Sequence, residues 1–192
     1  MSVAAQPDLE PGKVYRTRDL ARWGANPTRL ATRLVRDGHL VALGHGLYGC
    51  HRPSFFGPAL PDDAAVMRAL LGSDDFVFSG PATWNPLGLG STQLSAATFV
   101  YNRKRSGNFE FGNRTYLLRR VDYPDEVTPE WRVVDLFRHR MQAGVDAATL
   151  VRNLRHAIKE QRFDVAALLV AAERYAEHAV ASLIADAADA WV

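Results

Sequence analysis

Several features are scarce or missing in this 192-residue chain. The single cysteine, Cys50, excludes an internal disulfide framework and is typical of a protein in a reducing cytoplasm. No run of about eighteen apolar residues occurs, so we expect no transmembrane helix. The first residues also lack the basic and apolar pattern of a signal peptide. We therefore expect a cytoplasmic protein with no membrane partner.

The sequence also lacks the patterns that carry catalysis or bind metal. It has no phosphate-cradling loop of the Walker type and no Gly-x-Ser-x-Gly elbow. Glu110 lacks the lysine that a restriction-type nuclease places two positions further on, and no Asp-x-Asp pair follows Gly72-Ser73, as a nucleotidyltransferase requires. No pair with zinc spacing occurs among His39, His45, Cys50 and His51. We expect no catalytic residues, no metal and no cofactor.

Negative charge is scarce in the N-terminal part of the chain. Between Lys13 and Arg52, eight basic side chains are accompanied by only Asp19 and Asp37, which gives this segment a net charge of +6. Because the whole chain carries +2, the rest must carry −4. A basic head on a mildly acidic body is typical of proteins that bind polyanions. The alternative is that these arginines only keep the surface solvated.

The most informative stretch runs from Asn26 to Cys50. Asn26 suits an N-cap, Pro27 suits the first helical position, and Gly38 suits a left-handed C-terminal cap, so we predict a helix from Pro27 to about Asp37. At about 100° per residue, the apolar residues share one face of this helix. The opposite face carries Thr28, Arg29, Thr32, Arg33 and Arg36.

The segments on either side of this helix complete a recognisable pattern. Thr17–Trp23 is predicted to form a short helix, and the turn at Gly24-Ala25 leads into the second helix. The segment 39–50 is predicted to form a hairpin that turns at Gly44-His45-Gly46. Two short helices followed by a hairpin are typical of a winged helix-turn-helix, although the supporting helix that usually comes first is either missing or supplied from elsewhere in the chain.

This interpretation assigns roles to the polar side chains of the head. Recognition helices read bases mainly with their N-terminal part, so we expect Thr28, Arg29 and Thr32 to reach base edges. Arg33 and Arg36 are expected nearer to phosphates, as are Arg16 and Arg18 at the start of the preceding helix. His45 lies at the predicted wing tip, where it either reaches DNA or is an exposed turn residue.

The rest of the chain predicts an α+β fold. We expect a winged helix-turn-helix head over residues 1–52, a linker over 53–61 pinned by Phe55 and Phe56, and an effector domain over 62–192. That domain should contain a small antiparallel sheet and a C-terminal helical bundle. Its predicted helices span 62–71, 79–89 (capped by Ser79), 129–141, 146–160, 162–175 and 177–190, and its strands 76–78, 96–102, 108–111 and 115–121.

Two segments of this second part could contact a partner. The basic loop Arg103-Lys104-Arg105 could touch nucleic acid or an acidic protein, or could be a solvated hairpin. The helix that contains Leu168–Ala171 is apolar nearly all round, which predicts burial in the fold or under a partner. Trp84 and Leu87–Leu89 are expected in the core.

Two stretches of sequence suggest a family. They are LVRDGHLVALGHGLYG, and FSGPATWNPLGLGSTQLSAATFVYNRKRSG together with the later DYPDEVTPEWRVVDLF. Together they resemble the AbiEi-type antitoxins of type IV toxin–antitoxin pairs. The resemblance implies a non-enzymatic protein whose winged-helix head represses its own operon. It also implies a C-terminal domain that opposes a nucleotidyltransferase-like toxin.

Two other classes of function stay open at this point. The first is an interaction module that binds a protein or RNA through the basic head, without operator recognition. The second is a nuclease or transferase with a degenerate site, a hypothesis that only Gly72-Ser73 and Glu110 support.

Overall fold

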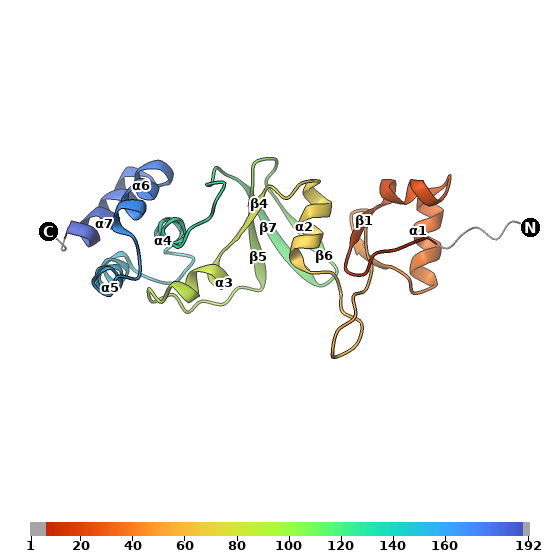
Figure 1. Ribbon diagram of the computed structural model, residues 1–192, viewed down its shortest axis with the longest axis horizontal. Coiled ribbons are helices and arrows are strands. Elements are labelled where there is room, and N and C mark those ends of the chain that lie inside the picture. Colours follow the sequence, from red (N-terminus) through yellow and green to blue (C-terminus); the bar gives the residue numbers. More distant parts are fainter. Residues whose placement is uncertain (1–6, 190–192) are drawn as a thin grey trace, which may run out of the picture. The chain divides into compact units, whose positions relative to one another are not determined.

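The computed structural model describes residues 7–189 and has an α+β fold with two small sheets (Figure 1). The chain forms two compact units. The first unit comprises the chain up to Phe76 together with Phe109–Thr115, and the second comprises Val77–Asn108 and the chain from Tyr116 onward. The first unit thus extends beyond the predicted head and includes both the segment predicted as a linker and the helix that follows it.

The first unit is built around a three-stranded antiparallel sheet. Its strands are β1 (Val14–Arg16), β2 (Val41–Gly44) and β3 (Leu47–Gly49), in the order β1-β3-β2. Between β1 and β2 lie the 3₁₀ helix η1 (Thr17–Trp23) and helix α1 (Pro27–Arg36). Helix α2 (Asp63–Leu71) follows β3. The prediction of two short helices and a hairpin at these positions is confirmed.

Local sequence explains both ends of α1. The Asn26 side chain accepts a hydrogen bond from the backbone N–H of Arg29 at 3.0 Å, so the predicted N-cap is confirmed. Gly38 has a φ of +77°, the left-handed conformation that commonly follows a helix. The buried face of α1 is Leu30, Ala31 and Leu34, as the helical period predicts. These three pack in a core with Tyr15, Leu20, Leu40 and Cys50.

The prediction that Phe55 and Phe56 pin residues 53–61 to a surface is wrong. Both side chains are 96% exposed. The segment is held instead by its own backbone, since Arg52 and Ala59 exchange two hydrogen bonds of 2.9 Å each. Three prolines and a glycine keep this segment out of a longer strand, and it forms a closed loop.

The four-stranded sheet has the order β4-β5-β7-β6. Its strands are β4 (Phe76–Ser79), β5 (Ala97–Asn102), β6 (Gly107–Phe111) and β7 (Arg114–Arg120). The two-residue loop Gly112-Asn113 joins β6 to β7, which makes this pair antiparallel. Between β4 and β5 lie α3 (Pro81–Trp84) and the 3₁₀ helix η2 (Asn85–Leu87).

The second unit ends in four helices, α4 (Pro129–Arg138), α5 (Ala147–Lys159), α6 (Val165–Tyr175) and α7 (His178–Ala188). Thr128, Asp146 and Asp164 each cap the helix that follows by accepting a backbone N–H. Helix α4 packs against α6, and α5 packs against α7. Their shared core also contains Trp84, Leu87 and Leu89, as predicted. Within residues 7–189, no helix is long and apolar enough to cross a membrane.

One local prediction for the second unit is wrong, because Ser79 does not cap α3, whose N-cap is Gly80. Burial of helix α6 within the fold is only partial, since Leu168 is buried while Leu169 is 39% and Val170 is 65% exposed. Burial of these two side chains under a partner stays a prediction. A run of apolar residues does not indicate how many faces of a helix find a neighbour.

Candidate nucleic-acid interface

The polar face of α1 lies open to solvent. The side chains of Thr28, Arg29, Thr32, Arg33 and Arg36 are all exposed. Across residues 7–189, neither the Arg29 nor the Arg33 side chain has a hydrogen bond or an ion pair. The donors of two guanidinium groups one helical turn apart are therefore open to solvent, and planar forks of this kind suit phosphate and guanine.

A hollow of about 620 Å³ runs beside this face. Its lining includes Arg29, Thr32, Arg33 and Arg36 from α1, together with Trp23 from the end of η1. The Arg22 guanidinium stacks on the Trp23 ring, with its central carbon 3.7 Å from the ring centre. The arginines thus border a concave surface.

Two members of the face have internal contacts. The Thr32 hydroxyl donates to the Thr28 backbone carbonyl at 3.1 Å, which leaves the Thr32 oxygen able to accept from a ligand. The Arg36 Nε lies 3.0 Å from a carboxylate oxygen of Asp37. Because both groups are exposed, this ion pair is weak and leaves Arg36 able to meet a phosphate.

The two arginines at the start of η1 differ from each other. Arg18 is exposed, and its Nε lies 3.9 Å from Asp19. Arg16 is half-buried, and its Nε donates to the backbone carbonyl of Ala69 near the C-terminus of α2. A cation suits that end of a helix, so the structure gives Arg16 a role within the fold.

His45 at the β2–β3 turn has neighbours in its own unit. Its ring centre lies 5.5 Å from that of Phe111 and 6.0 Å from that of Phe109, in edge-to-face geometry. The backbone N–H of Gly112 donates to the Leu43 carbonyl at 2.8 Å. The side chain of His45 is nevertheless exposed, so this turn is supported on one side and open on the other.

The basic loop of the second unit is a structured turn. Arg103 donates to the Tyr123 carbonyl at 2.7 Å, and its guanidinium stacks 4.4 Å from the centre of the Tyr123 ring. Arg103 also lies 3.0 Å from Asp125. The buried Asn102 accepts the backbone N–H groups of Lys104 and Arg105 at 2.9 and 2.8 Å. Arg103 is thus engaged within the fold.

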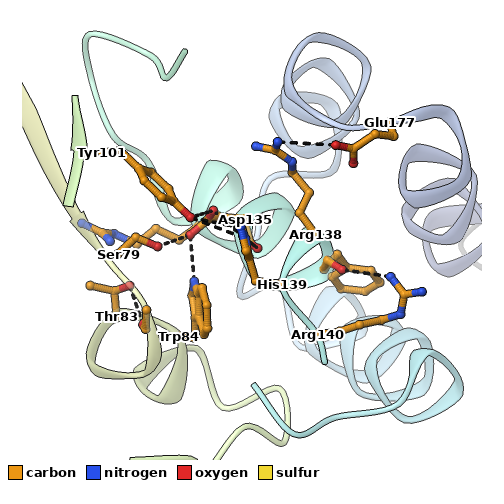
Figure 2. A network of polar contacts seen from close by, with 12 residues as sticks. Ser79, Thr83, Trp84, Tyr101, Asp135, Arg138, His139, Arg140 and Glu177 are labelled. Atoms are coloured by element: carbon orange, nitrogen blue, oxygen red, sulfur yellow. Dashed lines mark hydrogen bonds and ion pairs between the residues drawn. The ribbon is translucent and has the colours of Figure 1, made fainter. Parts of the chain in front are cut away.

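A second polar cluster, which we call the Asp135 cluster, lies inside the second unit (Figure 2). Asp135 on α4 is 2% exposed, and Trp84 Nε1 donates to its Oδ2 at 2.8 Å. The Tyr101 hydroxyl donates to Oδ1 at 2.9 Å, and the Ser79 hydroxyl donates to Oδ2. His139 Nδ1 lies 3.2 Å from Oδ1. One carboxylate thus ties together β4, α3, β5 and α4.

Gly80 makes this arrangement possible. Its φ is +94°, and a Cβ at this position would lie 2.7 Å from the Phe99 ring, so only glycine fits. The sharp turn at Gly80 lets Ser79, at the end of β4, and Trp84, at the end of α3, meet the same carboxylate oxygen.

The contacts of the cluster shift the pKa values of its members. Burial alone would raise the pKa of Asp135, but hydrogen bonds from His139, Ser79 and Trp84 outweigh it and hold that pKa below 3.8. Burial opposes the charged form of His139, but its bond to Asp135 outweighs burial and raises its pKa above 6.5. Burial and the Asp135 charge raise the pKa of Tyr101 above its usual value.

The order of these contacts indicates a structural role. In a Ser-His-Asp triad the histidine lies between the nucleophile and the carboxylate. Here Ser79 and His139 both bond directly to Asp135. No group of three or more His, Cys, Asp or Glu side chains in the described part of the chain is placed to hold a metal ion.

Comparisons with known proteins give a fold but no family. No protein-family model and no curated protein matches the chain. The chain is similar to the crystal structure of the RV2827C protein from Mycobacterium tuberculosis, with a TM-score of 0.55 and 16% sequence identity. The match covers 91% of this chain and 72% of that one. At this identity the similarity shows that the fold is shared.

Proposed function

We propose that this protein binds double-stranded DNA through the exposed face of α1. In this proposal η1, α1 and the β2–β3 hairpin act as a winged helix-turn-helix, with α1 as the recognition helix. The observation that carries the proposal is the exposed row on α1, in which the guanidinium groups of Arg29 and Arg33 lack partners across residues 7–189. Exposed arginines without internal partners suit a polyanionic ligand.

In this proposal the residues along α1 make two kinds of contact, to bases and to phosphates. Thr28, Arg29 and Thr32 lie in the first half of the helix and are the proposed base-reading residues, with Arg29 forming two hydrogen bonds to a guanine. Arg33 and Arg36 lie further along and bind phosphates, as does Arg18. Arg16 is left out of the proposed interface because its bond to the Ala69 carbonyl accounts for it. A DNA contact by His45, at the exposed β2–β3 turn, stays a prediction.

The biological role that fits such a head is transcriptional autoregulation in the cytoplasm. The test is fluorescence anisotropy with labelled duplex DNA taken from upstream of the protein's own gene, at low salt, against a shuffled duplex of equal composition. We expect tighter binding to the upstream duplex. Equal binding to both duplexes would show that the protein binds polyanions without sequence preference. No binding to either duplex would contradict the proposal. Stronger binding to RNA of the same sequence favours the interaction-module alternative.

The second candidate function is that of an antitoxin that opposes a nucleotidyltransferase-like toxin. Besides the AbiEi-like sequence segments, one structural observation favours a partner, namely the exposed apolar side chains of Leu169 and Val170 on α6. The test is co-expression with a nucleotidyltransferase-like toxin, taken from a gene adjacent to this one where such a gene occurs, scored by growth and by co-elution. Changing both residues to Asp should abolish rescue. Ser182→Asp on α7, which is also exposed, is the matched control and should rescue normally.

A further inference from the structure

The loop between β3 and α2 is drawn in orange in Figure 1. Two of its side chains are aromatic rings that lie open to solvent. Phe55 and Phe56 are each 96% exposed, with ring centres 5.2 Å apart in edge-to-face contact. A pair of neighbouring phenylalanines that is fully open to water is unusual, because each ring exposes a large apolar area. The two rings form one compact apolar knob, which we call the Phe tip.

Hydrogen bonds and prolines within this loop fix the backbone that carries the Phe tip. Arg52 and Ala59 exchange two backbone hydrogen bonds at its base, at 2.9 Å each. Across the turn, the Gly57 N–H donates to the Ser54 carbonyl at 3.1 Å, and the Ser54 hydroxyl donates to the Gly57 carbonyl at 2.5 Å. Pro53 and Pro58 flank the tip and restrict the backbone further. A loop ordered in advance loses little entropy when it binds.

The charge along the loop indicates what the Phe tip meets. From Gly38 to Pro61 the chain contains no acidic residue, while Arg52 at the loop base is exposed. The two carboxylates that follow are engaged, since Asp62 caps α2 and Asp63 pairs with Arg114. A neutral apolar pocket on a protein would not require acidic residues to be absent, whereas a phosphate backbone would. The loop also belongs to the same compact unit as α1. These observations favour nucleic acid as the occupant.

We infer that the Phe tip inserts between stacked base pairs of double-stranded DNA and bends it. This inference rests on the proposed DNA-binding function and adds a second mode of recognition to it. Apolar wedges of this kind partly unstack a base step and kink the duplex by about 20–90°. Because pyrimidine–purine steps such as TA and CA unstack most easily, the Phe tip selects sites by their deformability at positions that α1 does not read.

The test is a bending measurement with upstream duplexes of about 30 base pairs that carry a fluorescent donor and acceptor at their two ends. The wild-type protein should bring the ends closer together. Phe55→Ala/Phe56→Ala should leave the duplex straight and bind it about tenfold more weakly, because the apolar contact is lost. Since both rings are exposed, this variant should fold normally. Phe55→Leu/Phe56→Leu, which keeps an apolar wedge, should retain most of the bend.

The controls separate this inference from the proposed function. Leu94→Ala removes another side chain that is 90% exposed and should change neither bending nor affinity. If the wild-type protein binds without bending and the double alanine variant binds equally well, the wedge is wrong while binding by α1 stands. If the wild-type protein binds no duplex, both proposals fail. Binding to vesicles of phosphatidylcholine and phosphatidylglycerol that needs both rings, with DNA left straight, overturns the wedge in favour of a lipid surface.

Discussion

The two polar regions of this protein, the face of α1 and the Asp135 cluster, differ in where their charges lie and in how many partners those charges have. The face of α1 gathers charges at the surface and gives Arg29 and Arg33 no partner across residues 7–189. The Asp135 cluster buries one charge and surrounds it with four donors. Exposed ionic groups contribute little to folding, whereas a buried and fully bonded network fixes how its elements pack. The Asp135 cluster therefore serves the fold, whereas the α1 face contributes little to the fold and is open to the ligand that we propose.

The largest effect is expected from removing the buried charge. Asp135→Ala leaves Ser79, Trp84, Tyr101 and His139 without their shared acceptor, which should lower the free energy of unfolding of the second unit by about 3–5 kcal/mol. Hydrogen exchange followed by mass spectrometry should show faster exchange in residues 77–108 and 116–189. The exposed Asp186 on α7 gives the control, Asp186→Ala, which should exchange like wild type. Normal protection in the Asp135 variant would contradict the structural role.

The second largest effect is expected for the affinity of the protein for DNA. Arg29→Ala should weaken binding to the upstream duplex by about 1–3 kcal/mol and relax the preference at one base position, because a two-hydrogen-bond contact to guanine is lost. Competition between duplexes that differ at single positions measures this preference. Arg68→Ala on α2, which removes an exposed arginine paired with Asp74, is the control. A uniform loss over all sequences would assign Arg29 to the phosphate backbone instead.

A smaller effect is the pH dependence of the second unit. The pKa of His139 is raised above 6.5, so its stabilising contribution is complete below about pH 6.5 and is lost as the pH rises through the folded-state pKa. The pKa of Asp135 is held below 3.8, so its contribution is present above that pH and is lost as the pH falls through the folded-state value. The free energy of unfolding of the second unit should therefore be greatest between about pH 3.8 and about pH 6.5.

Denaturant unfolding at a series of pH values measures this dependence. His139→Gln should remove the decline on the alkaline side, a change of about 1 kcal/mol, which is the net contribution of one typical intramolecular hydrogen bond. The decline on the acid side should remain, because Asp135 is unchanged. A wild-type profile that stays flat from pH 6 to pH 9 would show that the His139–Asp135 contact adds nothing.

The smallest effect is expected at the end of α1. Arg36→Ala should weaken binding to all duplexes alike and reduce the slope of log affinity against log salt by about one, since one phosphate contact is lost. Titrations at four salt concentrations measure the slope. An unchanged slope would mean that Arg36 stays with Asp37 when DNA binds.

Local rules predicted helix α1 well. The N-cap at Asn26, the left-handed Gly38 and the 3.6-residue period place α1 to within one residue, and they also predict which of its faces is buried. The outward face of a short amphipathic helix follows from the same period, so the exposed arginines could be predicted. All of these signals lie within a few residues of the positions that they determine.

The contacts that sequence reasoning missed join distant residues. Asp135 meets Ser79 and Trp84 across more than fifty positions, and nothing local shows that these side chains converge. The one available signal was an aspartate between apolar residues, in the stretch WRVVDLF. The role of Arg16 was missed for the same reason, because its acceptor at Ala69 lies 53 residues away. Period and capping rules do not report long-range pairing.

The most direct test of the central claim is a paired measurement on Arg29→Ala/Arg33→Ala. Binding to the upstream duplex and thermal unfolding are measured on the same preparation. Because the two guanidinium groups are exposed and lack internal partners over residues 7–189, we predict that affinity falls at least about 30-fold while the melting temperature stays within about 2 °C of wild type. Unchanged affinity would contradict the account, whether or not the melting temperature also falls.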